Sequence, residues 1–174
     1  MAQAPPEWIM TTFSKLPPSL QEKAQEFLAR SMKDPYLPAL ALVPVAWGLA
    51  YVPHFVKVGA VLKHVGPEYD NMHPRSTNLD GFKEDSGLIK RGKACHDNGL
   101  EAFPPFAAAV ILCKVRKANS PEVVKLALRF IVARILFTIF YLGGVNKPIS
   151  ALRTVAWVTG VRSVMQLYSH ALSA

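Results

Sequence analysis

The sequence predicts an all-α protein, a bundle of four transmembrane helices preceded by an amphipathic N-terminal helix. Of the 174 residues, 51% are hydrophobic, and the mean hydropathy is positive. Both values are high for a soluble protein and expected for a small helical membrane protein. Four long apolar stretches follow one another from residue 37, separated by segments rich in Pro, Gly or charge. The chain therefore divides into an N-terminal extension, residues 1–36, and a four-helix membrane domain, residues 37–174.

Charge and composition exclude several classes of protein. The net charge is +8, yet Lys and Arg are scattered, and the longest basic run is Lys114–Lys117. A nucleic-acid interface would need clustering on one face, so we predict no nucleic-acid partner; membrane lipids with anionic head groups, or an anionic small molecule, explain the excess better. Cys95 and Cys113 are expected to be small apolar fillers. The five histidines show no metal-ligand spacing, and we predict no metal.

The N-terminal extension should carry one short helix, residues 19–32, with Ser19 as its N-cap and Glu22 at the capping-box position. Residues 1–36 lack the apolar core of a signal peptide. The helix has an apolar stripe, which indicates a position at the membrane surface or against a partner. The stripe consists of Leu20, Ala24, Phe27 and Leu28.

The first membrane span is predicted over residues 37–61, which supply enough apolar residues for a bilayer crossing. Pro44 and Pro53 should bend it, because membrane helices tolerate Pro where neighbours re-satisfy the backbone. Residues 63–90 form a long polar loop rich in turn residues. A loop of this length is more often functional or a docking element than a passive connector.

Three further spans are predicted over residues 93–114, 121–142 and 149–172. Pro104 and Pro105 should loosen the middle of the second span. Ser120, Pro121 and Glu122 provide a capped start for the third. The pair Gly143-Gly144 should end the third span, and Pro148 then restarts the chain as the fourth.

The stretch from Arg91 to Phe106 carries the polar residues around which the membrane domain is organised. On a helix, Arg91, Asn98 and Glu101 fall within about 80° of one another. An acid within the membrane is a functional-site candidate by default, although a Glu that only pins helices together is the alternative. Arg134 lies deep in the third span and needs an internal partner, for which Glu101 is the natural choice.

These residues together predict a polar pocket. Arginines near the ends of three spans, with one Glu and one Asn, form a lining that lipid would not tolerate. Arginine suits bidentate recognition of carboxylates, so the pocket suits a small zwitterionic or anionic peptide, with Glu101 receiving an ammonium group. Tyr141 lies two turns after Arg134 on the same helix face. The spacing supports a site but names no reaction.

The run R-x-x-A-x-x-x-N-x-x-E-A-F-P-P-F-A-A-A-V, from Arg91 to Val110, resembles the second-helix signature of the membrane-associated proteins in eicosanoid and glutathione metabolism, the MAPEG family. Three further stretches agree with this resemblance, which covers about residues 37–172. They are Tyr69-Asp70-Asn71 with Pro74-Arg75, similar to the YDN-x-x-PR loop of a largely uncharacterised branch; Ala133-Arg134 with Tyr141-Leu142; and Arg153 with Trp157 and Gly160.

The resemblance implies a homotrimer of four-helix bundles, multi-pass in the endoplasmic reticulum or another organellar membrane such as that of the mitochondrion. It implies glutathione bound at subunit interfaces, with Arg153 and Tyr141 as the catalytic residues. Arg153 would stabilise a thiolate that attacks an electrophilic lipid or reduces a hydroperoxide, and Tyr141 would line the site. The residues that would bind glutathione are Arg91, Asn98, Glu101 and Arg134, the last of these bracing Glu101.

The sequence also departs from the glutathione-using pattern. Many such members have an arginine where this chain has Ala94, and some have another where it has Asp97. Three interpretations therefore stay open. In the first, the chain is a membrane glutathione transferase or peroxidase acting on lipophilic electrophiles. In the second, it is a non-catalytic MAPEG-like subunit or scaffold of a larger membrane assembly, with the extension and the long loop as docking surfaces. In the third, it is a small-molecule or lipid-binding membrane protein of another kind.

Overall fold

The computed structural model describes residues 16–65, 72, 86–144 and 146–174. Within these residues it has five helices and no strand, which confirms the all-α prediction. The helices are α2 (Pro18–Lys33), α3 (Leu37–Val65), α4 (Ser86–Val115), α5 (Ser120–Gly143) and α6 (Lys147–Leu172).

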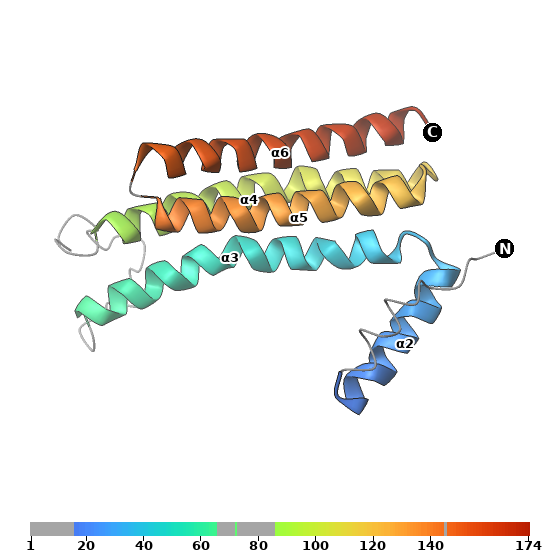
Figure 1. The fold of residues 1–174 in the computed structure, drawn as a ribbon, viewed down its shortest axis with the longest axis horizontal. Coiled ribbons are helices and arrows are strands. Elements are labelled where there is room, and N and C mark those ends of the chain that lie inside the picture. The colour runs from blue at the N-terminus through green and yellow to red at the C-terminus, as the bar shows by residue number, and fades with distance from the viewer. Residues whose placement is uncertain (1–15, 66–71, 73–85, 145) are drawn as a thin grey trace.

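The four long helices lie side by side, and consecutive helices run antiparallel (Figure 1). α4 and α5 pack against each other and against both α3 and α6. They therefore form the middle of the arrangement, with α3 on one side and α6 on the other. The short helix α2 projects away from the long helices at the end where the C-terminus also lies (Figure 1).

Proline and glycine set most helix boundaries as the sequence predicts, but the caps differ from expectation. The N-cap of α2 is Pro17 rather than Ser19, and the N-cap of α5 is Asn119; neither side chain makes a capping hydrogen bond. In both helices a Pro stands in the first two positions, where its missing N–H costs nothing. Only α6 has a side-chain cap among these, with the Ile149 amide donating to Oδ1 of Asn146 at 3.0 Å.

The polar loop predicted for residues 63–90 is shorter in the structure. Residues 63–65 belong to α3 and residues 86–90 belong to α4. α4 thus begins seven residues before the predicted start at residue 93. The YDN-x-x-PR stretch, residues 69–75, lies outside the described residues apart from Met72.

Of the described helices, α3 alone is long and apolar enough to cross a membrane by length and composition, over residues 37–63. The expected second, third and fourth spans correspond to α4, α5 and α6, whose charged residues lower their mean hydropathy. Hydropathy alone therefore does not show that the chain crosses a membrane more than once.

The core lies where α4 and α5 meet. The rings of Phe106 and Phe130 stack with centroids 4.0 Å apart, and both side chains are buried. α3 approaches α4 closely at Gly99, where an added Cβ would lie 2.9 Å from the Cβ of Ala50. This contact fixes the register of α3 against α4 next to the polar residues of α4.

Two interactions hold the start of α3 against the α4–α5 connection. The Lys114 ammonium lies 2.6 Å from a carboxylate oxygen of Asp34, and the Tyr36 hydroxyl donates to the carbonyl of Ala118. The ion pair with Lys114 and the backbone amide of Tyr36 hold the pKa of Asp34 below its usual range. No residue of α2 itself is buried.

Candidate functional site

Arg134 is the centre of the candidate site. It lies in the middle of α5 and is 7% exposed. Its Nη1 donates to Oδ1 of Asn98 on α4 at 2.9 Å, and its Cζ lies 4.2 Å from the ring centroid of Phe137. The guanidinium is therefore held by one neutral hydrogen-bond acceptor and one aromatic face.

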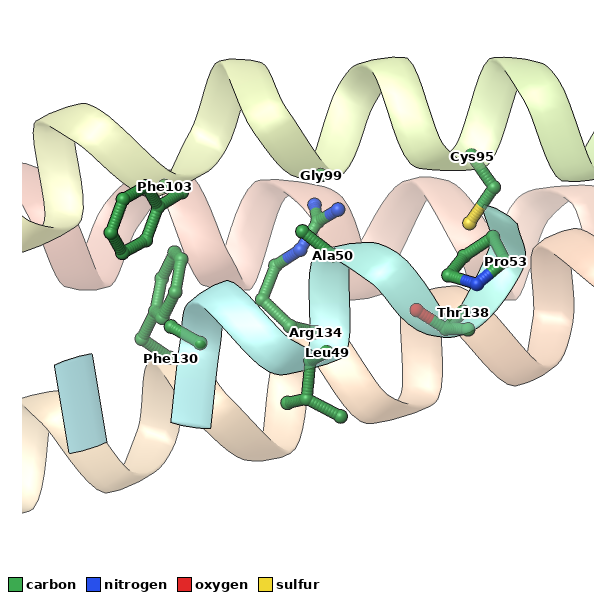
Figure 2. A pocket seen from close by; sticks show the side chains of 10 residues that line it. Leu49, Ala50, Pro53, Cys95, Gly99, Phe103, Phe130, Arg134 and Thr138 are labelled. Atoms are coloured by element: carbon green, nitrogen blue, oxygen red, sulfur yellow. The ribbon is translucent and has the colours of Figure 1, made fainter. Parts of the chain in front are cut away.

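Arg134 also lines two cavities. One holds about 10 Å³, close to the space of a single water molecule. Figure 2 shows Arg134 reaching from α5 toward Gly99 of α4, between Phe103 and Phe130 at one end of this cavity and Cys95 and Thr138 at the other.

The second cavity, of about 190 Å³, lies among α4, α5 and α6. Its lining is mainly apolar and includes Trp157, Gly160 and Tyr168 of α6, with Arg134 as its charged residue. It is smaller than the roughly 300–1,000 Å³ of typical small-molecule pockets. The cavity within one chain is therefore small for a peptide ligand.

A line of aromatic contacts joins Arg134 to Arg153. The ring of Phe137 lies 5.2 Å from that of Tyr141 on the next turn of α5, and the Cζ of Arg153 on α6 lies 4.6 Å from the Tyr141 centroid. Tyr141 thus positions the Arg153 guanidinium through a cation–π contact. The structure brings Asn98, Arg134, Tyr141 and Arg153 into one continuous set of contacts.

Arg91 and Glu101 lie at the margins of this set. Nε of Arg91 donates to the Leu142 carbonyl at 3.0 Å, which places Arg91 beside the C-terminal end of α5. The Glu101 side chain is exposed.

The prediction that Glu101 forms an ion pair with Arg134 is wrong within a single chain. Arg134 bonds Asn98 instead, and among the described residues no carboxylate lies within 4.0 Å of either Arg134 or Arg153. The reason is angular: Asn98 and Glu101 are one turn apart on α4 but differ by about 60° around the helix. Asn98 therefore faces α5 while Glu101 faces outward.

A family model described as the MAPEG family matches residues 39–173. The chain belongs to the MAPEG family. The matched region contains all of α4, α5 and α6 and all but the first two residues of α3. The four long helices are therefore the family domain, and α2 lies outside it. Comparison with curated proteins and with solved structures gives no significant match.

Three residues of the candidate site are missed by sequence reasoning, namely Cys95, Phe137 and Thr138. Cys95 is a free thiol that is 1% exposed, lines the small cavity and lies within electrostatic range of both Arg134 and Arg153. For Cys95 and Thr138, the signal that could have found them is helical spacing. Arg91, Cys95 and Asn98, and likewise Arg134, Thr138 and Tyr141, follow an i, i+4, i+7 pattern.

Cys113, by contrast, is a buried core filler whose thiol lies 3.2 Å from the Leu167 carbonyl. Within the part of the chain that the structure describes, no group of three or more His, Cys, Asp or Glu side chains is placed to hold a metal ion.

Proposed function

We propose that this MAPEG protein binds glutathione at the Arg134–Arg153 cluster and uses it to modify lipophilic electrophiles. One observation carries the proposal: two arginines lie in one set of contacts, one of them almost fully buried, without a described carboxylate partner. A buried charge is costly unless an opposite charge meets it. The carboxylates and thiolate of glutathione are suitable anions.

The residues have distinct proposed roles. Arg134, oriented by Asn98, binds a carboxylate, and Glu101 receives the ammonium group. Arg153, oriented by Tyr141, stabilises the thiolate, because a nearby cation lowers the pKa of a thiol. The glutathione thiolate forms a carbon–sulfur bond to an electrophilic carbon while a leaving group such as chloride departs with the bonding electrons. In the alternative reaction, two glutathione molecules are oxidised to the disulfide as a hydroperoxide is reduced to an alcohol and water.

The proposal includes the membrane and the oligomer. α3 to α6 cross the bilayer together, with their apolar outer faces toward lipid, and α2 lies along the membrane surface with its apolar stripe inward. A homotrimer completes the site, because the cavity within one chain is too small for a tripeptide and the exposed Glu101 then faces a neighbouring chain. The location is the endoplasmic reticulum or another organelle.

Calorimetric titration of the detergent-solubilised protein with glutathione tests the proposal, followed by a conjugation assay with a nitro-substituted aryl chloride. Arg153→Gln should weaken binding about 10- to 100-fold, since a charged hydrogen bond contributes roughly 1.5–3 kcal/mol. Arg162→Gln is the matched control, because Arg162 is exposed on the same helix. Equal weakening by both variants, or no heat with wild type at millimolar glutathione, would reject it.

A second function, that of a non-catalytic subunit of a larger membrane assembly, has its own supporting observation. The exposed Ala94 stands where many glutathione-using members have an arginine, and the carboxylate of Asp97 pairs with Lys93 at 2.7 Å. This face of α4 thus lacks two further cations. Chemical crosslinking in native membranes separates the two functions, because unlike chains joined to this face support the second and identical chains support the first.

A further inference from the structure

His54 of α3 and His96 of α4 form a pair that is far apart in the sequence. Their ring centroids lie 5.0 Å apart with the rings tilted by 52°, and both side chains are partly exposed. The ring of Tyr51 lies 5.1 Å from that of His96 and closes one side of the pair. None of these residues belongs to the set of contacts around Arg134.

Two close helix contacts hold this pair in place. Gly92 and Gly99 of α4 flank His96 by four and three residues. A Cβ added at Gly92 would lie 3.1 Å from the Pro53 carbonyl, and one added at Gly99 would lie 2.9 Å from the Ala50 Cβ. α3 and α4 are therefore in close contact on both sides of the histidines, and this packing sets the separation of the two backbones that carry the rings.

The hydrogen bond of His96 fixes which ring nitrogen is available. Nδ1 of His96 lies 2.7 Å from the Ala50 carbonyl, and a carbonyl only accepts, so Nδ1 carries the proton. Nε2 then keeps its lone pair. A backbone carbonyl that holds one ring N–H while the other nitrogen is free is the arrangement found in histidines that ligate metals.

The ring separation also matches a shared metal ion. Zinc lies about 2.0–2.1 Å from a histidine nitrogen, and two imidazoles at a tetrahedral angle then have centroids about 5 Å apart. We propose that His54 and His96 bind a divalent transition-metal ion between α3 and α4, with solvent completing the coordination. Imidazole pairs favour Cu²⁺, Ni²⁺ and Zn²⁺, with Cu²⁺ strongest, over Mg²⁺ and Ca²⁺.

The charges around the pair act in both directions. Lys57 lies within electrostatic range of His54 and weakens binding of a cation. Asp97, which follows His96 in the chain, lies within range of Lys57 and is paired with Lys93. Its carboxylate offsets part of that repulsion. Because both imidazoles are partly exposed, solvent can reach the ion and complete its coordination.

The test is titration of the full-length protein, purified without a polyhistidine tag and without glutathione, with Cu²⁺, Zn²⁺ and Mg²⁺. We expect one Cu²⁺ per chain, weaker Zn²⁺ and no Mg²⁺, with two nitrogen ligands in the electron paramagnetic resonance spectrum of the copper form. Substituting either His should weaken Cu²⁺ binding by about 10-fold or more. The variants are His54→Gln, His96→Gln and the double substitution, each checked for unchanged helical circular dichroism.

His170→Gln is the matched control, because His170 is a partly exposed histidine near the end of α6. It should bind Cu²⁺ as the wild type does. Unchanged Cu²⁺ affinity in the double variant, or an equal loss in the His170 variant, would overturn the proposal. Since this experiment contains no glutathione, its outcome is independent of the function proposed for the Arg134–Arg153 cluster.

Discussion

The guanidinium of Arg134 on α5 is held by Oδ1 of Asn98 on α4, at 2.9 Å, rather than by a carboxylate. A neutral acceptor orients the arginine without cancelling its charge. This distinction matters because an ion pair would have satisfied the buried cation internally. With Asn98, the positive charge remains available to a ligand.

Replacing Asn98 by Ala should destabilise the protein. The substitution removes the acceptor of a buried N–H, which costs about 1–3 kcal/mol. The apparent melting temperature in detergent, followed by circular dichroism, should fall. Glu101→Gln should have the same apparent melting temperature as the wild type, because Glu101 is exposed and does not contact Arg134. If the Asn98 variant were stable and the Glu101 variant unstable, the result would support an ion pair between Glu101 and Arg134 instead.

Replacing Gly99 by Ala should loosen the contact between α3 and α4. The new Cβ would meet the Cβ and Cα of Ala50 at 2.9 and 3.0 Å, so the helices must separate, and overpacking of this kind costs about 1–3 kcal/mol. The free energy of unfolding in mixed micelles measures the effect.

Gly48→Ala is the control for this prediction. Nothing lies within 4 Å of a Cβ added at Gly48, and Ala is favoured over Gly inside a helix by roughly 0.5–1 kcal/mol. This variant should therefore be slightly more stable than the wild type. Equal effects of the two substitutions would contradict the close contact at Gly99.

Acid should release the start of α3 from the α4–α5 connection. The pKa of Asp34 is lowered, first by its hydrogen bond from Lys114. A carboxylate with a lowered pKa stabilises the fold above its unfolded pKa, about 3.9, and this contribution is lost as the pH falls through the folded value. The protection of the Tyr36 and Leu37 amides against hydrogen exchange, relative to their intrinsic rates at each pH, should therefore fall below about pH 4.

Asp34→Asn provides the comparison for the acid effect. The protection of the same amides at neutral pH, relative to their intrinsic exchange rates, should resemble that of the wild type in acid and should not fall further on acidification. The hydrogen bond from the Tyr36 hydroxyl to the Ala118 carbonyl does not involve Asp34, so we expect only part of the attachment to be lost. A pH effect of the same size in Asp34→Asn would assign it to another group.

The helix boundaries were open to prediction because Pro and Gly mark them locally. Gly143-Gly144 ends α5, and α6 begins at Lys147 just before Pro148. Arg134 was identifiable for a similar reason, since a charged residue inside an apolar helix stands out. These signals need no knowledge of how the helices pack.

The partners of these residues depend on packing and were not open to prediction. Asn98 and Glu101 lie on one helical stripe, and periodicity cannot select which of them faces α5. His54 and His96 meet only because Gly92 and Gly99 set α4 against α3 in one register. A sequence read helix by helix contains no such information.

Substitutions at Tyr141 distinguish positioning of Arg153 from chemistry at the tyrosine hydroxyl. The Arg153 guanidinium lies over the Tyr141 ring, a contact of about 0.5–2 kcal/mol. Tyr141→Phe keeps this ring, and we expect glutathione binding and conjugation close to wild type. Tyr141→Leu removes the ring, and both glutathione binding and conjugation should fall by about 2- to 30-fold, the range that this energy corresponds to.

Calorimetry and the conjugation assay measure the effects of the Tyr141 substitutions on binding and on conjugation, with Ile139→Leu as a control at an exposed position of α5. A Tyr141→Phe variant that binds glutathione normally but conjugates slowly would instead make the hydroxyl the catalytic group.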